Sequence, residues 1–259
     1  MKQNKSALAK ETGCARSTLY YQSKQIIKDW QTKQLIENAL HIHPAYGHKR
    51  LAIHLKLNKK RILRVMHIFG IKPYRRTAKK TFALKPKDSL FPNLLIHEIP
   101  TGIGDIWACD FTYLKYRGYW VYVATVLDVY SKEVVGLSVM TTHGAQLVMN
   151  ALVSAIHHRP PPRISHSDQG SEYASRDYST LVQTVGIQQS MSRAGCPWEN
   201  GYQESFYKGF KIDLGDPNRF DTLGELVAEI YLTIHYYNTK RIHTALAMAP
   251  RQFAALESA

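Results

Sequence analysis

The chain has 259 residues, of which 44% are hydrophobic and 21% charged, values typical of a folded protein with one large domain or two small ones. No apolar run approaches the length of a membrane helix, and the residues after Lys2 and Lys5 do not form a signal peptide. Cys14, Cys109 and Cys196 are far apart and form no CxxC pair, which argues against a disulfide framework and a four-ligand zinc site. We expect a cytosolic protein without a membrane span.

Charge is distributed unevenly along the chain, whose formal net charge is +14. Residues 1–80 hold 19 basic and 3 acidic residues, whereas residues 81–259 hold 15 basic and 17 acidic ones. A segment this basic releases condensed counterions when it meets a polyanion, so the first third of the chain is predicted to bind DNA or RNA. The alternative is a basic face that is merely solvated.

Residues 1–30 are predicted to form a helix-turn-helix. The segment 6–24 indicates a short helix, a turn at Gly13, where positive φ is needed, and a second helix capped by Ser17. Leu19 of the second helix would pack on Leu8. A small helical hairpin without a role on DNA remains an alternative for this segment.

Residues 31–76 are predicted to form a second helical, DNA-binding module. Helices are expected over 27–41 and 48–55, and Asn58 is expected to open a third helix that ends at Gly70. The apolar residues expected to point inward are Leu35, Ile36, Ala39, Leu40, Ile62, Leu63, Val65 and Met66. The Pro- and loop-rich residues 77–100 are predicted to be a linker.

From Asp105 onward the pattern changes to strands rich in Val, Tyr, Trp and Thr. Runs at 105–116, 119–128 and 132–140, separated by short turns, predict three antiparallel neighbours. The elements expected after them are helix 145–158, strand 164–167, helix 177–185, strand 187–191 and helices 202–214 and 223–237. This order predicts an α/β domain over 101–259, with a mixed sheet and helices on its faces.

Three carboxylates in this domain are candidates for catalysis. Asp110 lies in an apolar strand, Asp168 ends the fourth predicted strand, and Glu204 lies on a helix. A carboxylate inside an apolar strand is costly to bury unless it meets a cation or several donors. Converging carboxylates are hard oxygen ligands of the kind that Mg²⁺ or Mn²⁺ prefers. Taken singly, each also has an ordinary structural interpretation. The acids expected to be structural or on the surface are Asp128, Glu133 and Asp177.

The segments around these carboxylates resemble a known family. Asp110, Asp168 and Glu204 resemble the DDE triad of transposases and retroviral integrases, and more closely that of the OrfB product of IS-three family insertion sequences. The segments that carry the resemblance are 107–113 (WACDFTY), 165–173 (SHSDQGSEY), 200–206 (NGYQESF), 237–246 (YNTKRIHTAL), 44–50 (PAYGHKR) and 60–66 (KRILRVM). They cover almost the whole chain in the family's order. Glu199 and Gln169 depart mildly from the family pattern.

The resemblance implies an RNase H-like core that binds two Mg²⁺ ions, with Mn²⁺ as a substitute, through Asp110, Asp168 and Glu204. It implies metal-dependent strand cleavage and strand transfer at element ends. Lys208 and Lys211 lie at i+4 and i+7 from Glu204, hence on the same helical face, and are expected to hold phosphates there. The other residues expected to contact DNA are Arg16, Lys49, Arg50, Lys59, Lys60, Arg61, Arg64, Arg75 and Arg76. His166, Ser171 and Tyr173 are expected to support the loop after Asp168, and His243 to serve the DNA or the core.

The partners implied are double-stranded DNA, as terminal inverted repeats and target, further copies of this chain on paired ends, and an upstream OrfA or OrfAB protein. The resemblance also implies a prokaryotic, cytoplasmic, nucleoid-associated protein. Two other functions stay open at this point. One is a DNA-binding regulator or accessory subunit that occupies ends without cutting and needs OrfA. The other is a plain RNase H-type nuclease. The HHCC zinc module of retroviral integrases is absent from the sequence.

Overall fold

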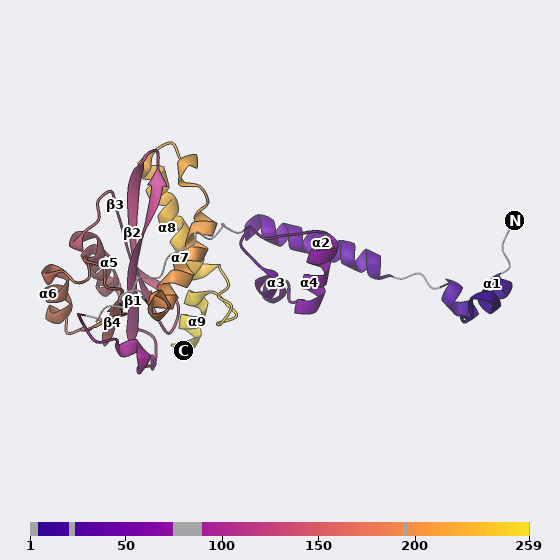
Figure 1. Ribbon diagram of the computed structural model, residues 1–259, viewed down its shortest axis with the longest axis horizontal. Coiled ribbons are helices and arrows are strands. Elements are labelled where there is room, and N and C mark those ends of the chain that lie inside the picture. Colours follow the sequence, from indigo (N-terminus) through magenta and orange to yellow (C-terminus); the bar gives the residue numbers. More distant parts are fainter. Residues whose placement is uncertain (1–4, 21–23, 75–89, 194–195, 259) are drawn as a thin grey trace.

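The structure is a computed structural model that describes residues 5–20, 24–74, 90–193 and 196–258 (Figure 1). The predicted DNA contacts at Arg75 and Arg76 lie outside these residues. Within the described residues, no helix combines the length and the apolar character needed to cross a membrane.

The first helical segment consists of α1 (Lys5–Thr12) and a 3-10 helix (Arg16–Tyr20). Gly13 between them has a φ of +63°, as its place in the predicted turn requires. Within the described residues, the second predicted helix is present as the 3-10 segment Arg16–Tyr20.

The second helical module consists of α2 (Gln25–Ile42), α3 (His48–Leu55) and α4 (Lys59–Ile68). Asn58 caps α4 by accepting a hydrogen bond from the Lys60 amide, which confirms the predicted helix start. Leu35 and Leu63 were predicted to be buried but are 46% and 36% exposed. The three helices enclose a narrow core, so only part of each predicted apolar stripe is covered. The buried apolar residues of the module are Ile36, Ala39, Tyr46, Leu51, Ile62, Val65 and Met66.

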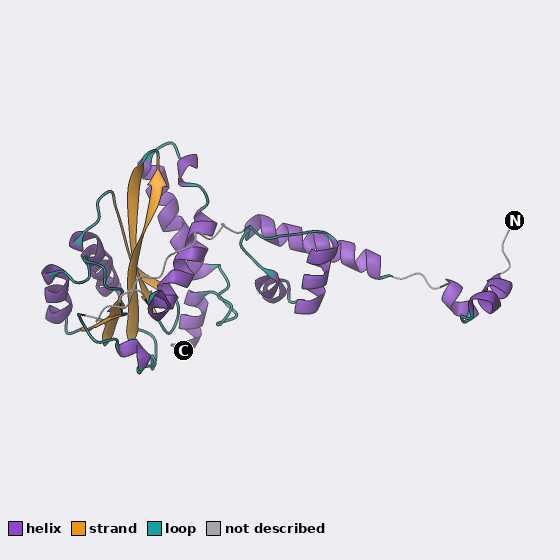
Figure 2. Ribbon diagram, in the orientation of Figure 1, coloured by secondary structure: helices purple, strands orange, loops and turns teal. Residues whose placement is uncertain are grey.

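The larger domain is built on a five-stranded mixed sheet (Figure 2). Its strands are β1 (Ile106–Tyr116), β2 (Tyr119–Asp128), β3 (Val134–Met140), β4 (Ile164–Ser167) and β5 (Gln188–Met191). Their order in the sheet is β3-β2-β1-β4-β5. The first three pair antiparallel and β4 and β5 add in parallel, which confirms the predicted mixed α/β fold.

Helices cover both faces of this sheet (Figure 1). The helices α5 (Ala145–His158) and α6 (Arg176–Thr184) pack on one face, around Trp107 and Leu147. The helices α7 (Gly201–Leu214) and α8 (Leu223–Thr239) pack on the other face, around Phe206 and Phe210. A further helix, α9 (Pro250–Glu257), packs against α8 and was not predicted.

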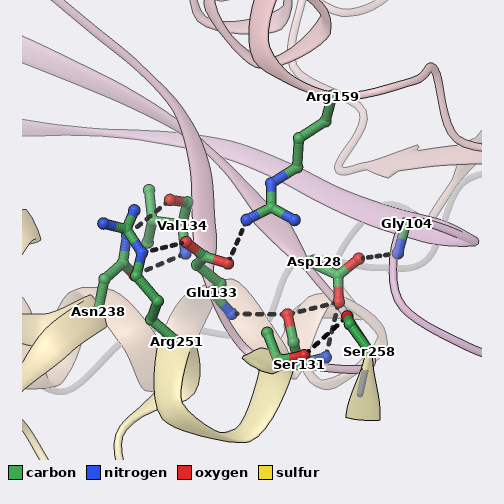
Figure 3. Close-up of polar contacts among 10 residues, drawn as sticks. Gly104, Asp128, Ser131, Glu133, Val134, Arg159, Asn238, Arg251 and Ser258 are labelled. Atoms are coloured by element: carbon green, nitrogen blue, oxygen red, sulfur yellow. Dashed lines mark hydrogen bonds and ion pairs between the residues drawn. The ribbon is translucent and has the colours of Figure 1, made fainter. Parts of the chain in front are cut away.

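Asp128 and Glu133 are structural, as predicted (Figure 3). The buried Asp128 carboxylate accepts hydrogen bonds from the Gly104 amide and from the amide and hydroxyl of Ser131, and so holds the β2–β3 turn. The Glu133 side chain is 1% exposed and pairs with Arg159 and Arg251. Glu133 therefore ties the end of α5 to the start of α9 through the sheet.

The last residues of the predicted linker 77–100 already contact the larger domain. Leu94 and Leu95 pack against Ile106 at the start of β1. The Asn93 amide donates to the Glu199 carboxylate at 2.7 Å, and the Leu94 amide donates to the Ser190 hydroxyl at 3.0 Å. Residues 93–95 therefore pack on the larger domain, where they contact the start of β1 and the edge strand β5.

Candidate active site

Asp110 and Asp168 lie side by side at the centre of the sheet. The parallel pairing of β1 with β4 places Ala108 opposite His166. Asp110, in β1, lies two residues after Ala108, and Asp168, just beyond the end of β4, lies two residues after His166. Carboxyl ends of adjacent parallel strands are where α/β domains bind ligands. The pairing of these strands thus unites two acids that are far apart in the sequence.

The electrostatics of Asp110 reflect this crowding. Burial and, after it, the negative charge of Asp168 raise the pKa of Asp110 to about 8, with a smaller contribution from Glu204. The Phe111 amide, which donates to Asp110 Oδ1 at 2.8 Å, and the Lys211 charge act in the opposite direction. A carboxyl group whose pKa is raised by burial and by a neighbouring negative charge is a common feature of functional sites. Such a pair is the kind of donor set whose repulsion a divalent cation relieves.

The loop after β4 holds Asp168 through the Gly170 amide and brings a second acid, Glu172, near it. The Gly170 amide donates to Asp168 Oδ1 at 2.9 Å, and a Cβ on Gly170 would lie 3.0 Å from that oxygen. Glu172 is buried, and its carboxylate contacts His143 Nδ1 at 2.8 Å and accepts from the Ser171 hydroxyl at 3.0 Å. Burial would raise the pKa of Glu172, but its hydrogen bonds outweigh burial and lower it.

The predicted support of this loop is confirmed for Ser171 by its hydrogen bond to Glu172. Tyr173, also expected to support the loop, is 1% exposed, and its carbonyl accepts from the Gln189 amide. His166 is fully buried in β4 against the Ser190 hydroxyl, and burial lowers its pKa to about 4. His166 is therefore a neutral core residue near neutral pH.

Helix α7 is fixed to β1 by three side chains on one of its faces. Gln203 donates to the Ala108 carbonyl at 2.6 Å, Asn200 to the Cys109 carbonyl at 3.3 Å, and Tyr207 to the Asp110 carbonyl at 2.7 Å. The Gln203 side chain is fully buried. Because these bonds reach three consecutive residues ending at Asp110, they set the distance of α7 from the carboxylates.

Glu204 follows Gln203 on α7, and the Glu204 side chain is exposed. Glu204, Lys208 and Lys211 share a face of the helix, as their spacing predicts. Lys211 Nζ lies 5.5 Å from the centre of the Tyr113 ring, and its charge reaches Asp110. In the part of the chain that the structure describes, no three His, Cys, Asp or Glu side chains are close enough together to hold a metal ion. The charges of both Asp168 and Glu204 nevertheless raise the pKa of Asp110, with Asp168 the larger contributor.

Several residues expected to contact DNA are engaged within the protein. Arg64 pairs with Asp29 of α2, with Nη1 2.7 Å from Oδ2, and Arg61 donates to the Thr32 hydroxyl at 2.6 Å. Both arginines therefore hold α4 against α2. Arg50 is half-buried. The predicted DNA contacts that are exposed are Arg16, Lys49, Lys59, Lys60 and Lys208, together with Arg64, whose guanidinium pairs with Asp29.

Sequence reasoning did not identify Gln203, Tyr207, Glu172 or His143 as parts of the site. Gln203 and Tyr207 flank Glu204 in the motif at 200–206 and just beyond it, but no local pattern indicates that they face a strand about ninety residues earlier in the chain. Glu172 lies within the segment 165–173, and its nearness to Asp168 could have been inferred from that segment.

Comparisons with known proteins agree with this fold. A family model described as an integrase core domain matches residues 100–197, and a second integrase core domain model matches residues 185–250. Among solved structures, the HTLV-2 integrase catalytic core domain in complex with magnesium is similar with a TM-score of 0.51 and 18% identity, covering 60% of this chain and 99% of that one. A chain of the simian T-cell lymphotropic virus intasome in complex with PP2A regulatory subunit B56 gamma is similar with a TM-score of 0.53 and 17% identity. It covers 83% of this chain and 73% of that one.

The fold and the family models thus make this chain an integrase-core protein with an RNase H-like sheet. It is 34% identical to the transposase for insertion sequence element IS904 of Lactococcus lactis, over 91% of this chain and 98% of that protein. It is also 32% identical to the transposase InsF for insertion sequence IS3A of Escherichia coli, over 59% of this chain and 54% of that protein. The chain belongs to the IS3 family of insertion-sequence transposases.

Proposed function

We propose that this chain cuts DNA at the ends of an insertion sequence and joins the freed ends to a target. In the first step, water attacks a phosphodiester and leaves a 3′ hydroxyl and a 5′ phosphate. In the second step, that 3′ hydroxyl attacks a phosphodiester of the target, forms a new one and releases a target strand end. The observation that carries the proposal is the neighbouring pair Asp110, within β1, and Asp168, just beyond the end of the adjacent parallel strand β4, where the charge of Asp168 raises the pKa of Asp110.

Asp110, Asp168 and Glu204 are the residues that would hold Mg²⁺ or Mn²⁺. The donor set fits, since all three are hard carboxylate ligands and the repulsion within the aspartate pair favours a bound cation. When bound, two such ions would activate the attacking oxygen and stabilise the leaving oxygen. The complex of the HTLV-2 integrase catalytic core domain with magnesium is consistent with this assignment.

The remaining residues of the site position these groups and the DNA. Asn200, Gln203 and Tyr207 hold α7 on β1, so the carboxylate of Glu204 is presented on the side of the aspartate pair. Lys208 and Lys211, on the same face of α7, would bind phosphates of the DNA next to the cut. Hydrogen bonds to charged groups are stronger than neutral ones, which suits lysines to this task.

The basic helices before residue 75 would bind the inverted repeats, and joining two ends requires more than one copy of the chain. The simian T-cell lymphotropic virus intasome, an assembly of a structurally similar protein, supports an oligomer on DNA. An OrfA or OrfAB partner is part of the proposal and can be tested by adding it to the reaction. The exposed cations Lys49, Lys59 and Lys60 are the proposed phosphate contacts of the helical module.

The experiment is strand cleavage and joining on a labelled duplex that carries the element's own terminal inverted repeat. It compares the wild type with Asp110→Asn, with and without Mg²⁺, and uses Asp177→Asn as a matched control because Asp177 is an exposed acid on α6. We expect metal-dependent products from the wild type and the control only. Tight end binding without any product, even after OrfA is added, would show a DNA-binding regulator and contradict the proposal.

A further inference from the structure

A cleft of about 780 Å³ opens on α7 away from Lys208 and Lys211. Gly201, Tyr202, Ser205 and Phe206 of α7 line it, whereas Glu204 does not. Its other walls come from the β2–β3 turn, the end of α8, the residues before β1, and α3 of the helical module. The volume lies within the range of about 300–1,000 Å³ that is typical of small-ligand sites.

The walls of this cleft are strongly basic. Four cations, Arg50, Lys132, Arg193 and Arg241, line it together with one acid, Glu199. Glu199 pairs with Arg193 at 2.6 Å, and Arg241 pairs with the buried Asp213 outside the cleft. Among the described residues, Arg50 and Lys132 form no ion pair with an acid. Two positive charges in the cleft are therefore unmatched by an ion pair.

Three polar atoms in the walls are buried without a hydrogen-bond partner in the described chain. They are Arg50 Nε, Asn93 Oδ1 and His243 Nδ1, and all three residues line the cleft. Buried polar atoms are nearly always paired with protein or ordered water, so these three atoms leave hydrogen-bonding capacity in the cleft, with Arg50 Nε as a donor for an anion. Burial and the nearby Lys132, Arg50 and Arg241 lower the pKa of His243 to about 4, which keeps its ring neutral in a positive field. An anion is the ligand that this field favours.

The mouth of the cleft carries aromatic rings. Trp198 is 67% exposed and Tyr202 is 41% exposed. Lys132 Nζ lies over the Tyr202 ring, 4.2 Å from its centre, so a cation and an aromatic ring are adjacent in one wall. Cationic grooves with exposed aromatic rings bind unpaired nucleic acid, because the cations hold phosphates and the rings stack on bases. Bases inside a duplex are stacked on each other and cannot stack on a side chain in this way.

We propose that this cleft binds an unpaired nucleotide of a DNA strand, with its phosphate on Arg50 and Lys132 and its base against Trp198. The inference rests on the proposed function only in that the chain acts on DNA, and it does not require cutting. Because Trp198 and Gly201 lie at the start of the helix that carries Glu204, the cleft would hold a strand that has been unpaired near the proposed cleavage point.

Fluorescence anisotropy of a labelled oligothymidylate tests the proposal with the full chain and without Mg²⁺. Trp198→Ala is the principal variant. Because the Trp198 side chain is exposed, its removal should not unfold the protein, so weaker binding would reflect a lost contact. Trp120→Ala is its matched control, since Trp120 is 44% exposed at the start of β2 and does not line the cleft. Lys132→Gln is compared in the same way with Lys115→Gln, whose side chain is exposed on β1.

We expect Trp198→Ala to weaken binding of the single strand between about fivefold and about a hundredfold, the range that one stacked base supplies. Lys132→Gln should lower the slope of log K against log salt by about 0.7, the value for one phosphate of a single strand. Neither variant should change the affinity for a blunt duplex of the same length. Both control variants should bind as the wild type does.

Unchanged single-strand binding in Trp198→Ala would overturn the proposal, as would equal losses in Trp198→Ala and Trp120→Ala. Competition by inorganic phosphate as effective as that by thymidine 5′-monophosphate would also overturn it, because the base would then play no part. Asp110→Asn should bind the single strand normally. A variant that loses cleavage but still binds the single strand would therefore test the active site alone. A variant that loses single-strand binding but still cleaves would test the cleft alone.

Discussion

The backbone amide of Ile242 donates a hydrogen bond to the Tyr46 hydroxyl at 2.8 Å, across 196 residues of sequence. Beside it, His43 Nδ1 lies 2.6 Å from the Tyr236 hydroxyl, and the His43 ring stacks on Tyr46. The segments 44–50 and 237–246, which both carry the family resemblance, therefore meet in space. Their contact joins the helical module to the domain that carries the candidate active site.

Tyr46→Phe should destabilise this contact. The variant keeps the buried ring but leaves the Ile242 amide without its acceptor, which costs about 1–3 kcal/mol. Urea unfolding of the full chain measures the loss, and Tyr74→Phe is the control because Tyr74 is 56% exposed in the same module. Equal midpoints for wild type and Tyr46→Phe would show that the hydrogen bond does not hold the two parts together.

Tyr207→Phe should slow DNA cleavage without weakening DNA binding. The variant loses the 2.7 Å hydrogen bond to the Asp110 carbonyl and so loosens α7 relative to the aspartate pair. Small displacements in an active site reduce rates by up to about a hundredfold. Single-turnover cleavage rates and the Kd for the duplex should be measured together. Tyr231→Phe, on the exposed side of α8, should match the wild type in both.

Glu204→Gln should abolish cleavage and leave duplex binding intact or slightly tighter, because the substitution removes one negative charge from the face that would meet DNA. The side chain is exposed, so the fold should not change. Cleavage and electrophoretic mobility shift assays on the same inverted-repeat duplex provide the test. Retained cleavage would exclude Glu204 from the catalytic set.

Metal-free stability should depend on pH through Asp110. Its folded pKa of about 8 lies above the ordinary 3.8, so the folded state binds the proton more tightly than the unfolded state. Stability is therefore lost as pH rises from about 4 to about 8, and is regained as pH falls. Asp110→Asn should melt at a higher temperature than the wild type at about pH 8, by the equivalent of several kcal/mol, since one pKa unit corresponds to about 1.4 kcal/mol. If the difference in melting temperature between Asp110→Asn and the wild type were the same at about pH 5 as at about pH 8, the raised pKa of Asp110 would be contradicted.

The cations of α4 should fall into two classes. Lys59→Gln with Lys60→Gln should lower the salt slope of duplex binding by about 2 and leave the melting temperature unchanged, because both side chains are exposed. Arg64→Gln should lower the melting temperature, because it breaks the ion pair with Asp29 that holds α4 to α2. Thermal melting and salt titration of each variant separate the two roles. A normal melting temperature for Arg64→Gln would return Arg64 to the set of DNA contacts.

Most of the secondary structure and the fold class were predictable, because strands and helices leave periodic patterns in the residues that form them. Helix α5 runs over the predicted residues 145–158, and the three antiparallel strands lie where alternating Val, Tyr and Thr indicated them. Helix α9, for which the sequence predicted no bounds, buries few side chains, among them Pro250 and Ala254. Leu35 and Leu63 show that an apolar stripe predicts a helix but not how much of it a small module covers.

The amino-acid sequence alone determined the elements, the basic first third and the choice of Asp110, Asp168 and Glu204, because each follows from neighbouring residues or a local motif. Only the tertiary structure decided that Gln203 and Tyr207 hold α7 on β1 and that Arg64 faces Asp29. It also decided that Arg50 and Trp198, from different parts of the chain, line one basic cleft. The physical reason is that these contacts join side chains to distant carbonyls, carboxylates or rings, and contacts over such separations leave no period in the sequence.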